Sequence, residues 1–586
     1  MVELLVDGHT VHTKEELSFT LVRENPLLTR NGDYTYDIEI SLYDPNNLKM
    51  YLPESRINGE GRHIARVAEL RDNGNVICRG TEVILEKENA DLKLQIVADN
   101  SEFNYLINHL SGNAENKIRE MDFGKVECDA EMAASVVNSI YPQTNFICPP
   151  IFTKKEGEYT LFNHISVYYK DIEYDAEGKI LPQPFLLFYI EKLITLLGYK
   201  IQENCLLREE KWRRLVLIHG YDTNEYAKML PNWTVSQFVE EVEKFFNVVF
   251  LVDSVKKEVK IVSVRDWRTT QSIMCIDQKQ IVDEFDKKFD EDEKGVFTDY
   301  ANVKYTLPDT SYWKLLDIEP NIWKKVEIEE KYFDSVEVDI PNWDDFTVYK
   351  DPRTEVMYKV RINKGEGFTH KIKNRVQTFQ RFISADKSDG VELKIIPAEI
   401  HCGECAAGSD GLNMGWFLYP VSEYSEVLEE DRGFYELIEE GEMADSAVDY
   451  LQVAFYAGVV GVRLPLGGEK AHYKDTALPM CFTTKYTIAS GMMTCWEEGE
   501  IGCWDDKMTL ELCGKNGRVA NELNNDIVIA GGEVHVIRFL AKNKIDPTMI
   551  FNIKNRLYFC KQLKYEYKDG MLGDVIEGEF VPARHA

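Results

Sequence analysis

Both ends of the chain are built from strand-length segments that turns separate at short, regular intervals. Tyr34–Leu42 alternates apolar and polar side chains almost strictly, which is the pattern of a strand with one face in water. Two hairpins are predicted after it, one joining Ile64–Leu70 to Val76–Cys78 and the other joining Thr81–Lys87 to Leu92–Ala98. Short strands at this spacing predict a barrel or a sandwich for the N-terminal part.

The end of the chain predicts a second all-β unit. Ile550–Phe580 has the pattern of a β-meander with turns at Lys554–Arg556 and Lys568–Gly570. The Asp-Gly pair in the second turn is a strong signal of a two-residue hairpin connection. Further strands are predicted at Thr354–Ile362, Val391–Ile396, Lys485–Ser490, Lys507–Cys513 and Gly532–Phe539.

Two helices and a hairpin are predicted in the middle of the chain. Phe185–Leu197 places its apolar residues on one helical face, and Gly198 follows where a left-handed residue ends a helix. Thr234–Gln237 forms a capping box that starts a second helix, which Asn247 ends. The strands Val248–Val252 and Glu258–Val264 come directly after it. This pattern predicts an α+β domain in which a hairpin packs on two helices.

The connecting segments carry weaker patterns. Residues 126–180 predict irregular structure. Asp283–Glu293 holds seven acidic residues against two lysines, so it is predicted to be a solvated loop or linker. The later part of Glu423–Asp449 is predicted to be helical.

Charge excludes some partners. The 586 residues include 68 basic and 100 acidic side chains, a net charge of −32, which repels DNA phosphates and anionic membranes. No signal peptide and no membrane span are predicted, so we expect synthesis and storage in the cytoplasm until assembly. The 12 cysteines are scattered, which predicts reduced, packed thiols rather than a disulfide framework.

No catalytic motif is present in the sequence. Phosphate-binding glycine loops, the Gly-x-Ser-x-Gly elbow and His-Glu-x-x-His are all absent. We therefore predict no enzyme activity and no catalytic, cofactor-binding or metal-ligating residues. The cluster His401, Cys402 and Cys405 has zinc-ligand spacing, but a closed site needs a fourth ligand, and Cys495 and Cys503 are only loose candidates. Two reduced thiols in a glycine-containing loop is the favoured interpretation.

A glycan-binding or glycan-cleaving surface protein is the alternative function. Glu429–Asp431 and the pair Glu497 and Glu498 supply neighbouring carboxylates, and Trp496 and Trp504 could stack on a sugar ring. Such carboxylate pairs occur by chance among 100 acidic residues, so a solvated face is favoured. The isolated histidines His164, His219 and His535 are predicted to be core residues with satisfied hydrogen bonds.

Several stretches together resemble a known group of proteins. They are Arg23–Ile40, Pro45–Leu48, Gly80–Val83 with Val97–Asn104, Pro182–Ile201, Leu230–Phe238 with the hairpin after it, and the Ile550–Phe580 meander. In pattern and order they resemble tail-tip proteins, the baseplate-hub or tail-associated group, of long-tailed phages and prophages of Bacteroides-type bacteria. The likeness covers about half of the chain.

The resemblance implies an architecture and a role. It implies a β-rich α+β chain with tube-like β-barrel domains at 1–150 and at 276–400 plus 546–586. An α+β domain at 151–275 and a mixed insertion at 401–545 complete it. It also implies a ring, a homotrimer, at the tail tip of the virion, which joins the tail tube or distal tail protein to spike or fibre proteins. DNA would pass through its channel without sequence-specific binding.

Overall fold

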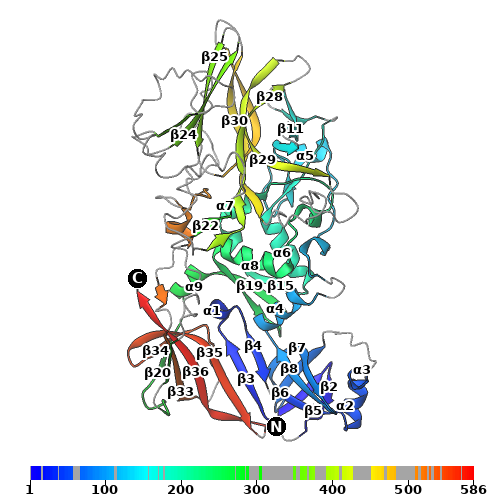
Figure 1. Ribbon diagram of the computed structural model, residues 1–586, viewed down its shortest axis with the longest axis vertical. Coiled ribbons are helices and arrows are strands. Elements are labelled where there is room, and N and C mark those ends of the chain that lie inside the picture. Colours follow the sequence, from blue (N-terminus) through cyan, green and yellow to red (C-terminus); the bar gives the residue numbers. More distant parts are fainter. Residues whose placement is uncertain are drawn as a thin grey trace, which may run out of the picture.

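The computed structural model is an elongated molecule with strands at both ends and helices between them (Figure 1). It describes residues 2–585 except 57–65, 290–302, 307–346, 377–390, 427–449 and 484–507, and except shorter breaks of one to six residues. Strands predominate over helices, so the chain is a β-rich α+β protein, as the sequence predicts.

Strands from both ends of the chain form one 15-stranded sheet, called the terminal sheet below. Its N-terminal strands are β1 (Val2–Val6), β2 (His9–Val11), β3 (Phe19–Glu24), β4 (Asp33–Tyr36), β5 (Ile38–Ser41), β6 (Val67–Asp72), β7 (Asn75–Glu88) and β8 (Asp91–Val97). Its later strands are β20 (Ile273–Ile276), β21 (Asp286–Phe289), β32 (Ile527–Ile529), β33 (Glu533–Leu540), β34 (Ile550–Ile553), β35 (Arg556–Lys568) and β36 (Met571–His585).

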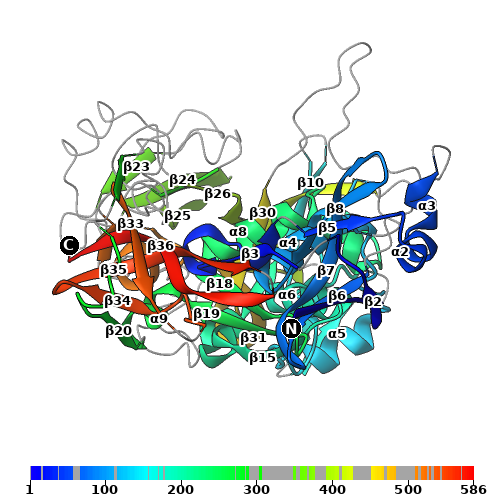
Figure 2. The ribbon, with the colours of Figure 1, turned by 90° about the horizontal axis from the view of Figure 1, so that it is seen from below.

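The terminal sheet is continuous across the two ends of the chain. β3 pairs antiparallel with β35, from Phe19 opposite Tyr567 to Glu24 opposite Gln562. β36 lies on the other side of β35, and the predicted hairpin between them closes with Lys568 opposite Met571. Figures 1 and 2 show the blue strand β3 beside the red C-terminal strands. We call the β3–β35 pairing the seam.

One hydrophobic core lies beneath both halves of this sheet. The alternation predicted for Tyr34–Leu42 is present as β4 and β5, which pair with β3 and β8 respectively. Alternate residues such as Leu21 and Ile40 point inward and are fully buried, and they share a cluster with Tyr565 and Phe580 from the C-terminal strands. Because apolar burial drives folding, the two ends stabilise each other and form one unit.

The predicted pair of closed barrels is not confirmed. The segment after β2 approaches β5 through a single bridge, between Thr13 and Ile40, and not through a strand ladder. The second half of the sheet shares its core with the first half. In a separate barrel, the edge strands of each half would pair with each other. Here β3 of the first half pairs with β35 of the second half, so the described terminal strands form one sheet.

The helices lie mainly in the middle of the molecule (Figure 1). They are α1 (Pro26–Thr29), α2 (Pro45–Met50), α3 (Leu52–Ser55), α4 (Asn100–Asn108), α5 (Ala130–Val136), α6 (Leu186–Leu196), α7 (Glu210–Arg213), α8 (Val235–Phe246) and α9 (Val264–Thr270). The two predicted helices are α6 and α8. The Thr234 hydroxyl accepts a hydrogen bond from the Gln237 amide, and α8 ends at Asn247, both as predicted. Asn247 adopts the left-handed conformation.

Around α6 and α8 lies a second core, called the central core below. The predicted hairpin is β18 (Val248–Asp253) with β19 (Glu258–Ser263), and β15 (Lys200–Asn204) pairs parallel with β19. The central core also takes in buried residues of later segments, among them Ile395 and Leu510. The domain borders expected from the sequence place Ile395 in the second barrel, whereas it lies in the central core. They place residues 533–540 in the insertion, whereas these residues form β33 of the terminal sheet.

The remaining strands lie above or around the central core. They are β9 (Phe146–Ile147), β10 (Ile151–Lys155), β11 (Glu158–Phe162), β12 (Ile165–Tyr168), β13 (Asp171–Tyr174), β14 (Gln183–Pro184), β16 (Leu215–Leu217), β17 (Gly220–Asp222), β22 (Lys304–Tyr305), β23 (Thr347–Lys350), β24 (Met357–Gly365), β25 (Phe368–Val376), β26 (Glu392–Leu393), β27 (Ile395–Pro397), β28 (Glu399–Ala407), β29 (Leu412–Glu426), β30 (Leu451–Leu466) and β31 (His472–Phe482). β28 to β31 form long hairpins at the top of Figure 1.

Three local predictions were wrong. Residues 126–180 contain α5 and β9–β13, whose lengths of two to seven residues give too little periodicity to detect. Part of the charged segment Asp283–Glu293 forms β21, an exposed strand that backbone pairing with β33 holds in place. Met508–Leu512 is buried but forms no strand. Most of Glu423–Asp449 and the whole of Lys485–Ser490 lie outside the described residues.

Candidate assembly surface

A row of charged residues crosses the solvent-facing side of the C-terminal half of the sheet. Lys564 on β35 lies opposite Glu577 on β36, which in turn lies opposite Arg538 on β33. Glu577 accepts a hydrogen bond from Arg538 Nε at 3.0 Å, and its other oxygen lies 3.5 Å from Lys564 Nζ. Opposite charges directly across antiparallel strands stabilise the pairing.

The neighbouring acidic group, Glu579, belongs to the same network. Lys288 of β21 contacts it at 3.1 Å and Lys564 at 3.5 Å. Burial raises the pKa of Glu579, but the hydrogen bond and charge of Lys288, with the charge of Lys564, outweigh burial and lower the pKa overall. This part of the sheet therefore presents paired charges despite the acidity of the whole chain.

Among the described residues, β21 is the last strand at one edge of the terminal sheet. Its four residues are exposed, and the Phe289 ring is 77% exposed at its end. Lys287 and Lys288 lie on this strand and pair with Glu533 and Glu579 of the same chain. Edge strands expose unpaired backbone groups to other chains, and charged side chains limit indiscriminate pairing. An ordered edge with an exposed phenyl ring can accept a specific partner.

A small apolar patch lies beside the other end of this edge. Leu540 on β33 is opposite Val575 on β36, and both side chains are exposed. Exposed Val282 lies alongside, because its amide donates a hydrogen bond to the Arg538 carbonyl at 3.0 Å. Contiguous exposed apolar residues commonly mark a protein–protein contact.

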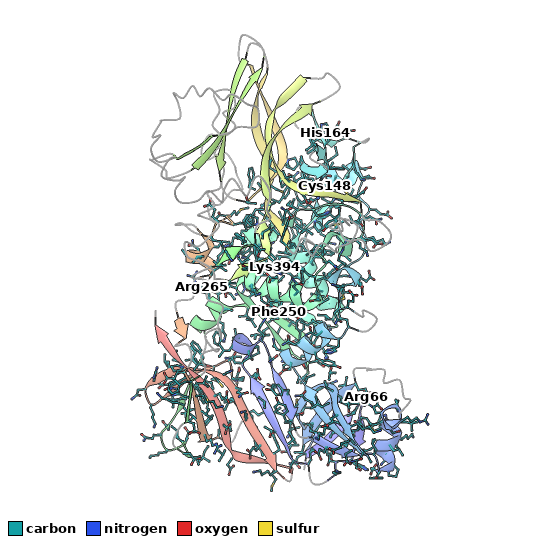
Figure 3. All side chains as sticks on the ribbon, viewed as in Figure 1. Arg66, Cys148, His164, Phe250, Arg265 and Lys394 are labelled. Carbon is teal, nitrogen blue, oxygen red and sulfur yellow. The ribbon has the colours of Figure 1, made fainter. Side chains whose placement is uncertain are left out.

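The terminal sheet is joined to the central core at the start of α4. The Ser254 amide donates to Asp99 Oδ1 at 2.9 Å, and the Val252 amide donates to Asn100 Oδ1 at 3.0 Å. The Asn100 side chain also donates to the Phe250 carbonyl, in the region that Figure 3 labels. These bonds fix the β18–β19 hairpin against the sheet, and we call this region the junction.

Glu102 is the buried acid of the junction, with 1% exposure. Its carboxylate accepts hydrogen bonds from Tyr199 at 2.7 Å and from Thr81 at 2.9 Å, and it forms an ion pair with Lys257 at 2.7 Å. The three partners come from different strands or turns. A buried charge with all partners in place costs far less than an unpaired one, so the network specifies a single docking geometry.

The surroundings of Asp99 at the junction disfavour the ionised form of its carboxyl group. Burial, and then repulsion from Asp33, raise its pKa to about 7, although the Ser254 amide and Arg23 oppose the shift. The Arg23 Nε–H group is shared by both oxygens of Asp33, at 3.1 Å from Oδ1 and 2.8 Å from Oδ2. We therefore expect the junction to respond to pH near neutrality.

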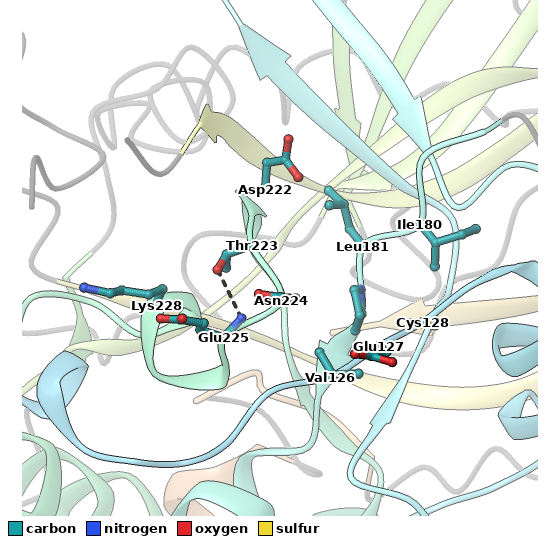
Figure 4. Close-up of a pocket in the computed structure, with 11 residues that line it drawn as sticks. Val126, Glu127, Cys128, Ile180, Leu181, Asp222, Thr223, Asn224, Glu225 and Lys228 are labelled. Carbon is teal, nitrogen blue, oxygen red and sulfur yellow. Dashed lines mark hydrogen bonds between the residues drawn. The ribbon is translucent and has the colours of Figure 1, made fainter. Parts of the chain in front are cut away.

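An open cavity of about 670 Å³ is lined by residues of 126–128, 180–182 and 222–228 (Figure 4). Its rim carries Glu225 and Asp222, and a hydrogen bond from the Glu225 amide to Thr223 Oγ1 at 3.1 Å shapes the turn between them. Lys125 pairs with Glu225 at 2.6 Å, and Lys179 pairs with Asp222. The carboxylates are thus held by lysines of the same chain. A smaller cavity of about 260 Å³ lies between α4 and α8.

The sequence-predicted candidates are placed as follows. His401, Cys402 and Cys405 lie on β28, whose backbone is a strand and not a loop, and their side chains are outside the described residues. The carboxylates at 429–431 and 497–498 and the tryptophans at 496 and 504 also lie outside them. Within the described part of the chain, no group of three or more His, Cys, Asp or Glu side chains could hold a metal ion.

Two of the three predicted core histidines are buried. His219 lies 2.7 Å from the Pro182 carbonyl, and burial lowers its pKa to about 4. His535 is 4% exposed and lies 3.0 Å from Glu533. The prediction is wrong for His164, which is partly exposed and lies 3.7 Å from Asp175 at the start of a hairpin.

The sequence gives no signal for the seam, because its two strands lie at opposite ends of the chain. It also missed a close pair of thiols, Cys128 and Cys148. None of the described helices has the length and apolar character needed to cross a bilayer.

Comparisons with known proteins do not assign the chain to a family. No family model and no curated protein matches the chain. Two solved structures align along its length. The 43 kDa tail protein of prophage MuSo2 from Shewanella oneidensis has 7% identity, covers 99% of this chain and 96% of its own, and has a TM-score of 0.29. The tail protein from Neisseria meningitidis MC58 has 8% identity, coverage of 100% and 96%, and a TM-score of 0.28. These scores are too low to transfer a fold or a role.

Proposed function

We propose that this chain is a structural component of a phage tail tip, a ring-forming hub. It would join the tail tube or distal tail protein to spike or fibre proteins. The proposal rests on the sequence resemblance to tail-tip proteins and on one structural observation, the seam. On this proposal the chain carries out no catalytic step and stays in the virion after assembly in the host cytoplasm.

The seam supports the proposal because it joins strands from both ends of the chain into one continuous sheet, which could form part of the wall of a ring. Six consecutive pairs, from Phe19 with Tyr567 to Glu24 with Gln562, join the halves. Each half would take the place of one tube-like domain. A chain with two such domains side by side can match a six-fold tube with three copies. A ring closes when unlike surfaces of successive copies meet head to tail.

We propose that β21 and the adjacent apolar patch form one of these surfaces. Phe289 and the patch of Val282, Leu540 and Val575 lie along the same edge of the terminal sheet, Phe289 on one face of the sheet and the patch on the other. The N-terminal half of the sheet on the next copy is the proposed partner. Burial of these exposed apolar side chains would supply the association energy, at about 25 cal/mol per Å² of apolar area.

Passage of DNA is supported by charge. The chain carries a net charge of −32. The basic residues Lys564, Arg538 and Lys288 on the solvent-facing side of the sheet are engaged by Glu577 and Glu579. Affinity for DNA comes mainly from cations that are free to replace counterions on the phosphates. A wall of paired charges offers few such cations, so a duplex would slide along it without binding.

Sedimentation velocity of the full chain tests ring formation. The expected result for the native chain is a single assembly, a trimer, at micromolar concentration. Phe289→Glu places a charge in the proposed contact without disturbing a buried residue, so it should shift the chain to monomer. Met132→Glu is the matched control, because Met132 is 44% exposed and lies on α5, outside the terminal sheet.

The control should sediment like the native chain. A native chain that stays monomeric at the highest attainable concentration, alone and with its co-expressed neighbours, would overturn the ring. A trimer that Phe289→Glu leaves intact would keep the ring but remove β21 from its interface.

A further inference from the structure

Cys128 and Cys148 place their sulfur atoms 3.5 Å apart. Cys128 directly precedes Asp129, whose side chain caps α5. Cys148 directly follows β9. The two thiols therefore sit at either end of the segment that contains α5, and 20 positions separate them in the sequence. A disulfide bond requires the sulfurs to approach to about 2.05 Å, which is a small movement from this starting point.

The two sulfurs differ in access. Cys148 is 1% exposed, and its carbonyl accepts a hydrogen bond from Tyr174 at 2.6 Å, which holds its backbone in place. Cys128 is half-buried and lines the open cavity, where Figure 4 places it beside Glu127. A small reagent in the cavity can thus reach Cys128 but not Cys148.

The pair also differs in acidity. The hydrogen bond from Cys148 lowers the pKa of Cys128, while burial raises the pKa of Cys148. The thiolate is the reactive form of cysteine, so Cys128 is the first to react. Burial raises the pKa of the other described cysteines Cys78, Cys205, Cys481 and Cys560, whereas Cys275 is exposed.

We propose that Cys128 and Cys148 form an oxidation site that takes a small disulfide, such as oxidised glutathione, as its substrate. The Cys128 thiolate attacks one sulfur of the reagent, forms a mixed disulfide and releases one thiolate. The Cys148 thiol gives up its proton to that thiolate. The Cys148 sulfur then attacks Cys128 and releases the second small thiol. One disulfide is consumed, two small thiols are produced and the protein loses two hydrogens.

The new bond would fasten α5 to the central core. It closes a loop of about 20 residues, and in the chain-entropy account such a loop stabilises the folded segment enough to lower its opening equilibrium on the order of 100-fold. In the reducing cytoplasm the pair would stay as thiols, and in an oxidising medium it would close. The site does not depend on ring formation.

Peptide mapping of the full chain tests the site. The chain is incubated with oxidised and reduced glutathione, free thiols are alkylated, and the digest is analysed without reduction. The expected product is one linked peptide pair, 128 to 148, in nearly every chain. Cys128→Ser should abolish the link. Cys148→Ser should leave glutathione attached to Cys128. Cys275→Ser, at the exposed cysteine, should form the link as the native chain does.

Limited proteolysis gives the second readout. Cleavage between residues 129 and 147 should slow on the order of 100-fold after oxidation and recover on reduction. Two outcomes would overturn the proposal. One is a native chain in which both thiols remain open to alkylation after denaturation. The other is glutathione that persists on Cys128 although Cys148 is present.

Discussion

The junction should weaken as the pH rises through neutrality, because Asp99 ionises there. Its pKa is raised from 3.8 to about 7 by burial first and by repulsion from Asp33 second. An acid with a raised pKa in the folded state favours folding only while it is protonated. The penalty is therefore absent below pH ~4, grows between pH ~4 and ~7, and is complete above ~7.

The size of the penalty follows from the shift. Each pKa unit corresponds to about 1.4 kcal/mol, so a shift of roughly three units gives ~4 kcal/mol at pH 8. Asp99→Asn removes the charge and keeps the oxygen that accepts the Ser254 amide at 2.9 Å. Asparagine also tolerates the positive φ of 52° at this position. The variant should therefore be more stable than the native chain at pH 8, and the difference should shrink as the pH falls and become small below pH ~4.

Hydrogen exchange of the Val252 and Ser254 amides is the assay, because both amides donate across the junction. After correction for the intrinsic pH dependence of exchange, the native chain should lose protection between pH 5 and 8, whereas Asp99→Asn should not. Glu240→Gln on α8 is the matched control. Lys244 outweighs the effect of burial and lowers the pKa of Glu240, so this variant should keep the native pH response. An Asp99→Asn chain that still loses protection with rising pH would refute the assignment.

Two further substitutions test the packing of the sheet. Gly80→Ala should prevent correct pairing of β7 and β8, because a Cβ there would lie 1.9 Å from the Val97 carbonyl oxygen, and circular dichroism melting should show a large loss of stability. The control Gly74→Ala, where a Cβ would have nothing within 4 Å, should cost only about 1 kcal/mol of stability. Phe559→Ala should cost about 3–5 kcal/mol in denaturant unfolding, because this fully buried ring packs near Trp267 between the sheet and α9. Equal stability of either variant and the native chain would contradict the packing described.

Local patterns predicted the elements that local chemistry determines. Thr234 caps the start of α8 with its side chain, and Asn247 caps the end with its left-handed backbone. The β6–β7, β7–β8, β18–β19 and β35–β36 hairpins follow alternation and turn residues, and all four are present. Each depends on residues only a few positions apart, which is the range over which periodicity carries information.

Long-range pairings could not be predicted in the same way. Nothing in Phe19–Glu24 specifies that its partner is Gln562–Tyr567, because any apolar strand with alternating burial would fit that edge. The same reasoning explains β21, whose charged, exposed residues gain order only from β33. The junction was missed for a related reason, since Glu102 meets Thr81, Tyr199 and Lys257 only after folding.

The sequence predicted an assembly protein, but it did not predict which strand forms the candidate surface. Strand-rich ends and the absence of catalytic motifs led to an assembly protein, whereas the edge that carries Phe289 lies in a segment predicted to be a loop. The Cys128 and Cys148 pair was expected to be two unrelated thiols, because cysteines 20 positions apart carry no spacing signal. The glycan-binding alternative rests on residues outside the described part of the chain.

Electron cryomicroscopy of the purified assembly tests the central claim most directly. The account predicts a three-fold ring in which β3, β35 and β36 line an open passage wide enough for duplex DNA. A particle without a passage would contradict it. So would a symmetric assembly in which these strands face outward, away from the axis, with β21 covered by its own chain.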